Sequence, residues 1–187
     1  MRIISGSMRG TKLFTLEGMD VTRPTLDRVK ESLFNILNFK LKDAIVLDLF
    51  AGSGSLGLES ISRGAKKSYF CDASRNAIKV INQNIEKTRC QEKATVINKD
   101  YKRALMEFKE KNIKFDIVFL DPPYKTNYNI ETVKFFEEFN LLNEDGIIVI
   151  ETDIEKEVLE ELKDFSVDIY DVRKYGRVSL IFIRRKG

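Results

Sequence analysis

The stretch that decides the fold runs from residue 44 to residue 59 and reads Ala44-Ile-Val-Leu-Asp48-Leu-Phe-Ala-Gly52-Ser-Gly54-Ser-Leu-Gly57-Leu-Glu59. A short apolar run is followed by three glycines and then by a segment with helical spacing. Glycine permits a tight turn and lets a ligand approach the backbone closely, so the stretch predicts a strand, a ligand-binding turn and a helix. The spacing also matches the dinucleotide pattern G-x-G-x-x-G, which is a weak signal alone, and a plain strand–helix turn is the alternative.

Apolar runs alternate with amphipathic segments from this stretch to the end of the chain. Such alternation predicts an α/β fold in which a mostly parallel sheet is covered by helices on both faces. The last two runs flank Tyr175-Gly176 and predict a hairpin. The predicted strands cover residues 44–47, 68–71, 94–97, 115–120, 146–150, 166–172 and 178–184, and the predicted helices cover 25–38, 55–63, 75–87, 102–111, 130–139 and 154–162.

The composition narrows the possible chemistry. The chain has 187 residues, 43% of them hydrophobic, which suits one globular domain with a small extension. We predict an N-terminal extension over residues 1–40 and the α/β domain over residues 41–187. The chain has no histidine, which excludes histidine-based nucleophilic machinery and histidine-ligated metal sites, so no metal is predicted. No apolar run suits a membrane helix or a signal peptide, and two cysteines are too few for a disulfide framework, so a cytoplasmic protein is expected. Nothing in the sequence demands a dimer or an obligate protein partner, so a monomer is expected.

Charge is distributed unevenly along the chain. Residues 1–30 carry six basic and three acidic side chains, and residues 172–187 carry six basic and no acidic ones, whereas the middle is acidic. Segregated basic segments are typical of proteins that bind polyanions, although solvated termini would show the same pattern.

Acidic residues follow several predicted strands, and ligands of parallel sheets bind at the carboxyl ends of the strands. Asp48 precedes the glycines and would repel a pyrophosphate but attract a ligand with a cation and an amino group. Asp72 could accept hydrogen bonds from ribose hydroxyls, or it could cap the following helix. Asp100 could accept from the exocyclic amine of a base, and a helix cap is again the alternative.

The most specific signal is Asp121-Pro122-Pro123-Tyr124, directly after the fourth strand. The two prolines fix the backbone and lack N–H groups, so the exposed groups are mostly acceptors beside a flat ring. Acceptors next to a stacking ring suit the planar NH2 of a nucleobase, whose nitrogen lone pair becomes more nucleophilic when the amine donates two hydrogen bonds. A strand-ending turn with a core tyrosine is the alternative.

Together these motifs resemble a class I S-adenosylmethionine-dependent methyltransferase that modifies amines. The N-terminal residues 2–13, 22–25 and 27–37 are similar to the bacterial 16S ribosomal RNA guanine-N2 methyltransferase family, the small-subunit methyltransferase D type. This resemblance implies a Rossmann-like, seven-stranded, mostly parallel sheet with an antiparallel last strand. It further implies S-adenosylmethionine as cofactor and, as target, the N2 amine of one guanine in 16S rRNA, within a small ribosomal subunit or an assembly intermediate.

The resemblance also assigns roles to residues. Asp121, Pro122 and Tyr124 would hold the target base, and the basic ends would contact RNA phosphates, with Arg23 and Arg28 alternatively bracing the acidic rim. The implied cofactor contacts are Asp48, Phe50, Gly52, Gly54, Asp72, Ala73, Asp100 and Tyr101. The implied RNA contacts are Arg2, Arg9, Lys12, Arg23, Arg28, Arg173, Lys174 and Arg177.

Three other functions compete with this interpretation. The Asp121–Tyr124 turn would serve adenine N6 in DNA or RNA by the same acceptor geometry. The glycine pattern would serve a nicotinamide-dependent oxidoreductase, in which tyrosine or lysine would have to transfer the proton. A non-catalytic RNA-binding module could retain the same fold.

Overall fold

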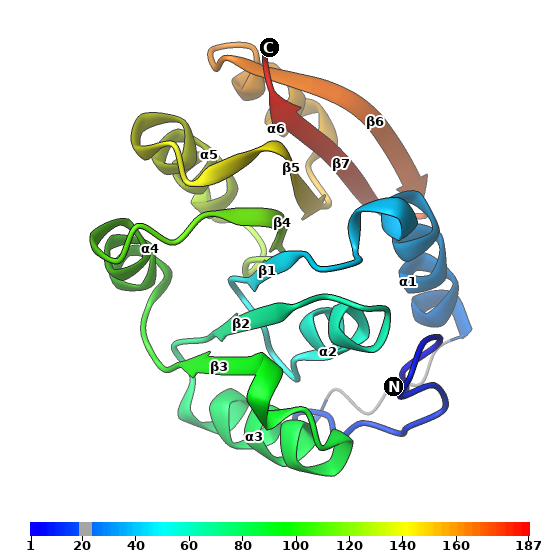
Figure 1. The fold of residues 1–187 in the computed structure, drawn as a ribbon. Coiled ribbons are helices and arrows are strands. Elements are labelled where there is room, and N and C mark those ends of the chain that lie inside the picture. Colours follow the sequence, from blue (N-terminus) through cyan, green and yellow to red (C-terminus); the bar gives the residue numbers. More distant parts are fainter. Residues whose placement is uncertain (19–23) are drawn as a thin grey trace.

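A computed structural model describes residues 1–18 and 24–187, without the side chains of residues 24 and 25. Seven strands form a single sheet in the order β3-β2-β1-β4-β5-β7-β6 (Figure 1). β7 runs antiparallel to both of its neighbours, and the pairs from β3 to β5 are parallel. The strands are β1 (Ile45–Asp48), β2 (Lys67–Cys71), β3 (Ala94–Ile97), β4 (Phe115–Leu120), β5 (Leu142–Thr152), β6 (Val167–Tyr175) and β7 (Val178–Arg185).

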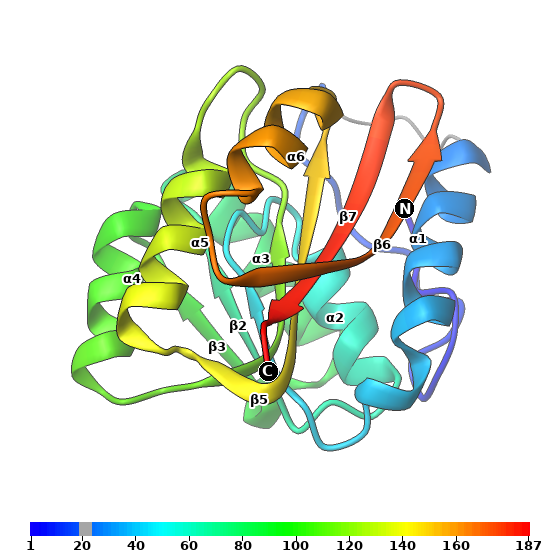
Figure 2. The same ribbon diagram turned by 90° about the horizontal axis from the view of Figure 1, so that it is seen from above.

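Helices cover both faces of the sheet (Figures 1 and 2). α4, α5 and α6 pack on one face through a single large apolar cluster, and α1, α2 and α3 lie on the other. None of the described helices is long and apolar enough to cross a membrane. The helices are α1 (Pro24–Leu37), α2 (Ser55–Ser62), α3 (Arg75–Thr88), α4 (Tyr101–Glu110), α5 (Tyr128–Phe139) and α6 (Glu155–Leu162), with short 3-10 turns at Asn38–Lys40 and Gln91–Lys93.

The structure confirms the predicted fold class, including the antiparallel last strand and the hairpin of β6 and β7. β3 and β4 have the predicted bounds. β5 is longer than predicted, because Leu142 pairs with Phe115 four residues before the apolar run begins at Gly146. Residues 143–145 of β5 are polar and give no pattern typical of a strand, so the pairing of this part of β5 with β4 could not be predicted from the sequence.

Residues 1–18 are held against α2 by a buried carboxylate. Glu59 is fully buried and accepts hydrogen bonds from the backbone N–H groups of Ile4 (2.9 Å) and Ser5 (3.0 Å). It also forms ion pairs with Lys30 and Arg63, both at 2.9 Å. Because Lys30 belongs to α1, this one side chain ties the N-terminal segment and α1 to the helix that follows the glycine turn.

The two basic ends of the chain meet in space. The Ser32 hydroxyl on α1 hydrogen-bonds to the Tyr175 hydroxyl at the end of β6. Beside this contact, Arg28 and Arg173 line a surface pocket of about 420 Å³ between the helix and the strand. Segments more than a hundred residues apart in the sequence therefore lie side by side, as Figure 2 shows for α1 and β6.

Candidate active site at the strand ends

The glycine turn connects β1 to α2 with two residues in left-handed conformation. Gly52 has a φ of +57° and Gly54 a φ of +81°. A Cβ at Gly52 would meet no atom within 4 Å, so the turn borders open space that a ligand can enter. At Gly57, in contrast, a Cβ would lie 2.3 Å from the Phe70 ring, so this glycine is required for α2 to pack closely on β2.

Asp48 ends β1 and is almost completely buried, with 3% of its surface exposed. Among the described residues its carboxylate has one hydrogen-bond donor, the Gly57 N–H at 3.2 Å. Desolvation raises its pKa to about 7; the Gly57 hydrogen bond partly opposes this shift, and the nearby Asp121 and Asp72 add to it. A buried carboxylate with so few donors is well suited to receive a cationic ligand.

Two further acids flank Asp48, because the sheet register places them on neighbouring strands. Asp48 pairs with Phe70 on β2 and with Phe119 on β4, so Asp72 and Asp121 each lie two residues beyond it. Asp72 accepts hydrogen bonds from the Gly52 N–H at 3.0 Å and the Ser74 N–H at 2.9 Å. Asp72 thereby fixes the glycine turn, while Ser74 is the residue that caps α3 through the Ala77 N–H.

Asp100 lies two residues beyond β3 and caps α4. Its carboxylate accepts from the N–H groups of Lys102 (3.1 Å) and Arg103 (3.2 Å). The helix-cap alternative weighed from the sequence is therefore present, and it leaves carboxylate lone pairs free for a ligand. Ala73, the remaining small residue at this edge, is exposed.

Aromatic rings form the wall of the site next to the glycine turn. Phe50 and Tyr101 lie 5.5 Å apart between ring centroids, and Tyr128 stacks on Phe50 at 6.1 Å. Tyr101 is largely buried and donates a hydrogen bond to Glu131, which holds its ring in place. Tyr128 was not predicted from the sequence, because it sits on α5 and meets the other two rings only in the folded chain.

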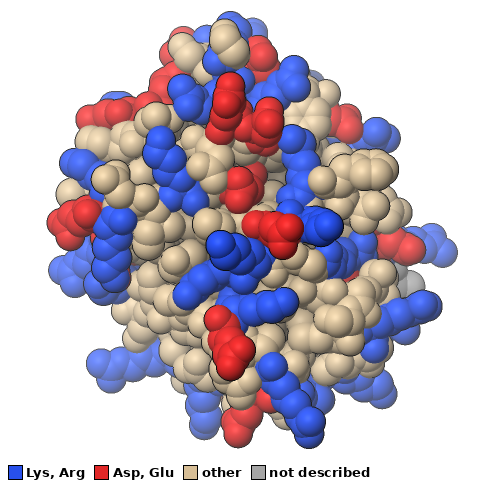
Figure 3. All heavy atoms as spheres, in the orientation of Figure 1, with Lys and Arg blue, Asp and Glu red and all other residues tan. Residues whose placement is uncertain are grey.

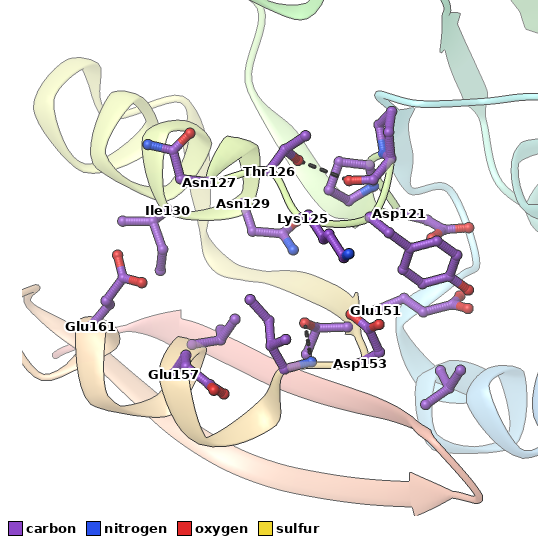
Figure 4. Close-up of a pocket in the computed structure, with 17 residues that line it drawn as sticks. Asp121, Lys125, Thr126, Asn127, Asn129, Ile130, Glu151, Asp153, Glu157 and Glu161 are labelled. Carbon is purple, nitrogen blue, oxygen red and sulfur yellow. Dashed lines mark hydrogen bonds between the residues drawn. The ribbon is translucent and has the colours of Figure 1, made fainter.

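The Asp121–Tyr124 turn is an exposed corner after β4. Tyr124 has 69% of its surface exposed, so the alternative of a core tyrosine is not what the structure shows. Asp121 is accessible to solvent and is one of the residues that line a cavity (Figure 4). Desolvation raises the pKa of Asp121 to about 6. Desolvation also raises the pKa of Tyr124, with further contributions from the charges of Asp121, Glu151 and Asp153.

This cavity has a volume of about 400 Å³ and lies between the Asp121–Tyr124 corner, α5, the end of β5 and α6. Five of its lining residues are acidic, namely Asp121, Glu151, Asp153, Glu157 and Glu161, and Figure 4 shows the last two projecting from α6. Sequence reasoning missed Glu151, Asn129 and Asn127. The signal for Glu151 was available, because it is an acid directly after an apolar strand, as Asp48 and Asp121 are.

None of the described residues predicted to contact RNA is among those that line the acidic cavity. Arg2 pairs with Asp27 at 3.3 Å, Arg173 pairs with Asp171 at 3.1 Å, and Arg28 shares the α1–β6 pocket with Arg173. Arg23 falls outside the described residues. Figure 3 shows basic side chains spread over one face, with acidic side chains between them. The other predicted contacts, all exposed, are Arg9, Lys12, Lys174 and Arg177.

The sheet order with an antiparallel β7, together with the glycine turn and the strand-end acids, defines the class I methyltransferase fold. A solved structure of yhhF from Escherichia coli matches with a TM-score of 0.82 and 31% identity, covering 100% of this chain and 98% of its own. The Bacillus subtilis protein YlbH is 37% identical over 187 residues, the full length of both chains. Ribosomal RNA small subunit methyltransferase D of Haemophilus influenzae is 37% identical over 181 residues, covering 94% of this chain and 93% of that one.

The family model described as Conserved hypothetical protein 95 matches residues 1–184. The chain therefore belongs to this family of methyltransferases and is a relative of small-subunit rRNA methyltransferase D.

Proposed function

We propose that this protein transfers a methyl group from S-adenosylmethionine to the N2 amine of a guanine in the 16S RNA of the small ribosomal subunit. The observation that carries the proposal is the position of the Asp121–Tyr124 corner. The corner presents the Asp121 carboxylate and the exposed Tyr124 ring beside the cavity of about 400 Å³. It also lies close to the glycine turn, because Asp48 pairs with Phe119 on β4 and Asp121 follows two residues later. The relationship to small-subunit methyltransferase D supports rRNA as the substrate class.

The glycine turn and its acids fit a positively charged methyl donor. S-adenosylmethionine supplies a sulfonium-activated methyl group when bound. Asp48 offers a buried carboxylate with one donor among the described residues, and Gly52 borders open space. Asp72 and Asp100 keep lone pairs for ribose hydroxyls and a base amine, and Phe50, Ala73 and Tyr101 line the approach. The cationic donor also offsets the repulsion among these acids.

The target amine would be held by the corner. Asp121 and the Pro122 carbonyl accept its two N–H groups, and Tyr124 stacks on a base that has left its own stack. Two donated hydrogen bonds direct the nitrogen lone pair toward the methyl group. The chain therefore aligns the reacting atoms and excludes water, and this catalysis requires no histidine. After transfer the nitrogen must lose one proton, and Asp121, with its pKa raised to about 6, is placed to accept it.

RNA would lie across the surface formed by residues 1–40 and the β6–β7 hairpin. This assignment gives the N-terminal extension its role, because Glu59 holds it against α2 and the Ser32–Tyr175 contact brings α1 to the hairpin. Val178, at the start of β7, lines the acidic cavity, so the β6–β7 hairpin connects the proposed RNA surface to that cavity. Phosphate contacts there would position the RNA without reading its sequence.

The test is methyl transfer from radiolabelled S-adenosylmethionine to three substrates: small ribosomal subunits lacking the modification, free 16S rRNA and duplex DNA. Labelled subunits are digested and the methylated nucleoside is mapped by mass spectrometry. We expect one N2-methylguanosine in 16S rRNA and no product with Asp121→Ala. Labelling of DNA at adenine N6, or unchanged activity in Asp121→Ala, would refute the proposal.

A further inference from the structure

Glu151 and Asp121 lie side by side at the edge of the sheet. β4 and β5 are parallel with Leu120 paired to Ile150, so the next residue of each strand is an acid at the same level. Both acids line the 400 Å³ cavity, and Figure 4 shows them on the same side of it. Two neighbouring carboxyl groups therefore face one space that a nucleobase can enter.

Within the described residues, neither Asp121 nor Glu151 has a hydrogen-bond donor or a basic partner for its side chain. Desolvation raises the pKa of Glu151 to about 8, with a further contribution from the charge of Asp121. Donors brought by a ligand favour the ionised form of a carboxyl group, so a ligand with two adjacent N–H groups would stabilise this pair in its ionised form.

A separate observation concerns a polar side chain of α5 that also lines the cavity. Asn129 on α5 has 6% of its surface exposed, and Figure 4 shows its side chain projecting into the cavity. Its Oδ1 has no hydrogen-bond partner among the described residues. Buried polar atoms are nearly always paired in folded proteins, so this acceptor is available to a donor that enters the cavity.

The pattern of acceptors matches one base better than the others. Guanine presents two adjacent donors on its Watson–Crick edge, N1–H and the N2 amine. Adenine presents its N6 amine next to N1, which is an acceptor and would face a carboxylate. A flipped base is read by hydrogen bonds to this edge, and a site built for a donor strongly rejects an analogue that lacks it.

We propose that Glu151 accepts the N1–H of the target guanine while Asp121 accepts from its N2 amine, which makes Glu151 the residue that selects guanine. This inference rests on the proposed function and adds the means of base selection to it. Glu151 contacts the base, and the methyl transfer itself takes place at the N2 amine beside Asp121.

The test replaces the mapped target guanine with 2-aminopurine by splinted ligation of the RNA before subunit assembly. 2-Aminopurine keeps the 2-amine but has an acceptor at N1. Wild-type protein should methylate it with a kcat/KM about 100-fold below that of guanine, because the N1 acceptor then faces the Glu151 carboxylate with no proton between them. In Glu151→Gln the amide can donate to that N1, so the preference for guanine should shrink by about tenfold or more.

The comparison of ratios isolates the contact, because the missing O6 of 2-aminopurine affects wild type and variant alike. Glu161→Gln, which removes an exposed acid of the same cavity on α6, is the matched control and should keep the wild-type ratio. An unchanged ratio in Glu151→Gln would overturn the inference, as would loss of both activities with intact cofactor binding. Failure of wild-type protein to methylate any RNA guanine would instead refute the proposed function.

Discussion

Two buried carboxylates in the same glycine-rich segment have opposite environments. Glu59, on the inner side of α2, accepts two backbone N–H groups and pairs with Lys30 and Arg63. Asp48, at the end of β1, has only the Gly57 N–H among described donors. Burial alone would raise the pKa of both. For Glu59 the partners reverse this effect and the pKa is lowered, whereas for Asp48 it rises to about 7.

The difference distinguishes a structural charge from a candidate ligand-binding one. Glu59 has all the donors it needs within the chain, so it stabilises the docking of the N-terminal segment. Asp48 has one such donor among the described residues and lies near the open space at Gly52, and we therefore propose that a ligand supplies its partner. Burial of an acidic side chain is therefore not by itself a sign of function. A buried acid that has few hydrogen-bond donors and lies beside a cavity is a better candidate for a functional residue.

The largest expected effect is on stability. Glu59→Gln should lower the free energy of unfolding by about 3–5 kcal/mol, because Lys30 then stays buried without its counter-charge. Burial already outweighs Glu59 in its effect on Lys30 and lowers the pKa of this lysine. Urea unfolding followed by circular dichroism at pH 8 measures the change. Asp48→Asn is the matched control and should cost less than about 1 kcal/mol, because it removes an unfavourable buried charge; equal losses would contradict the comparison.

The order of the two variants should be reversed for cofactor binding, in which Asp48→Asn should have the larger effect. Asp48→Asn should weaken the binding of S-adenosylmethionine by about tenfold or more, equivalent to about 1.4 kcal/mol, because the amide cannot balance a cation. Isothermal titration calorimetry at pH 8 measures the dissociation constant. An affinity equal to that of wild-type protein would show that Asp48 serves only to hold Gly57.

The affinity for S-adenosylmethionine should also depend on pH. The pKa of Asp48 is raised to about 7 in the free protein, and a cationic ligand binds its ionised form, so binding should tighten as the pH rises from 6 to 8. For one proton the change is at most about tenfold per pH unit below the pKa. Asp121 and Glu151 titrate in the same range, so the decisive result is a flatter profile in Asp48→Asn than in wild-type protein.

The smallest expected effect extends the comparison to surface charges. Arg173 already pairs with Asp171, whereas Arg177 has no ion-pair partner among the described residues. Arg177→Gln should reduce the slope of log affinity for RNA against log salt by about 0.7–0.9, the value for one phosphate contact, and Arg173→Gln should reduce it by less. Filter binding to 16S rRNA at several salt concentrations measures both slopes. A larger change in Arg173→Gln would mean that the Asp171 pair opens when RNA binds.

The sequence allowed the fold and most of one edge of the site to be predicted. The period of apolar residues in a strand differs from that in a helix, so β3 and β4 were predicted with their observed bounds. Parallel strands bring their carboxyl ends to one edge, so Asp48, Asp72, Asp100 and Asp121 could be grouped without coordinates. Tyr128 and Asn129 could not be assigned to the site from the sequence. They lie in the first turn of α5, which carries no recognisable motif, and they reach the site only through the packing of that helix.

What the sequence by itself determined is the local order of strands, turns and helices, together with the acids that follow the strands, since both depend on residues close together in the chain. Only the tertiary structure decided which acids of the chain have partners. Glu59 is satisfied by Lys30 and the backbone of residues 4 and 5, Asp48 is left with one donor, and Glu151 stands beside Asp121. The ionisation of a carboxyl group depends on the donors that remote segments of the chain bring within a few ångströms. The local sequence around the carboxyl group does not indicate which segments these are.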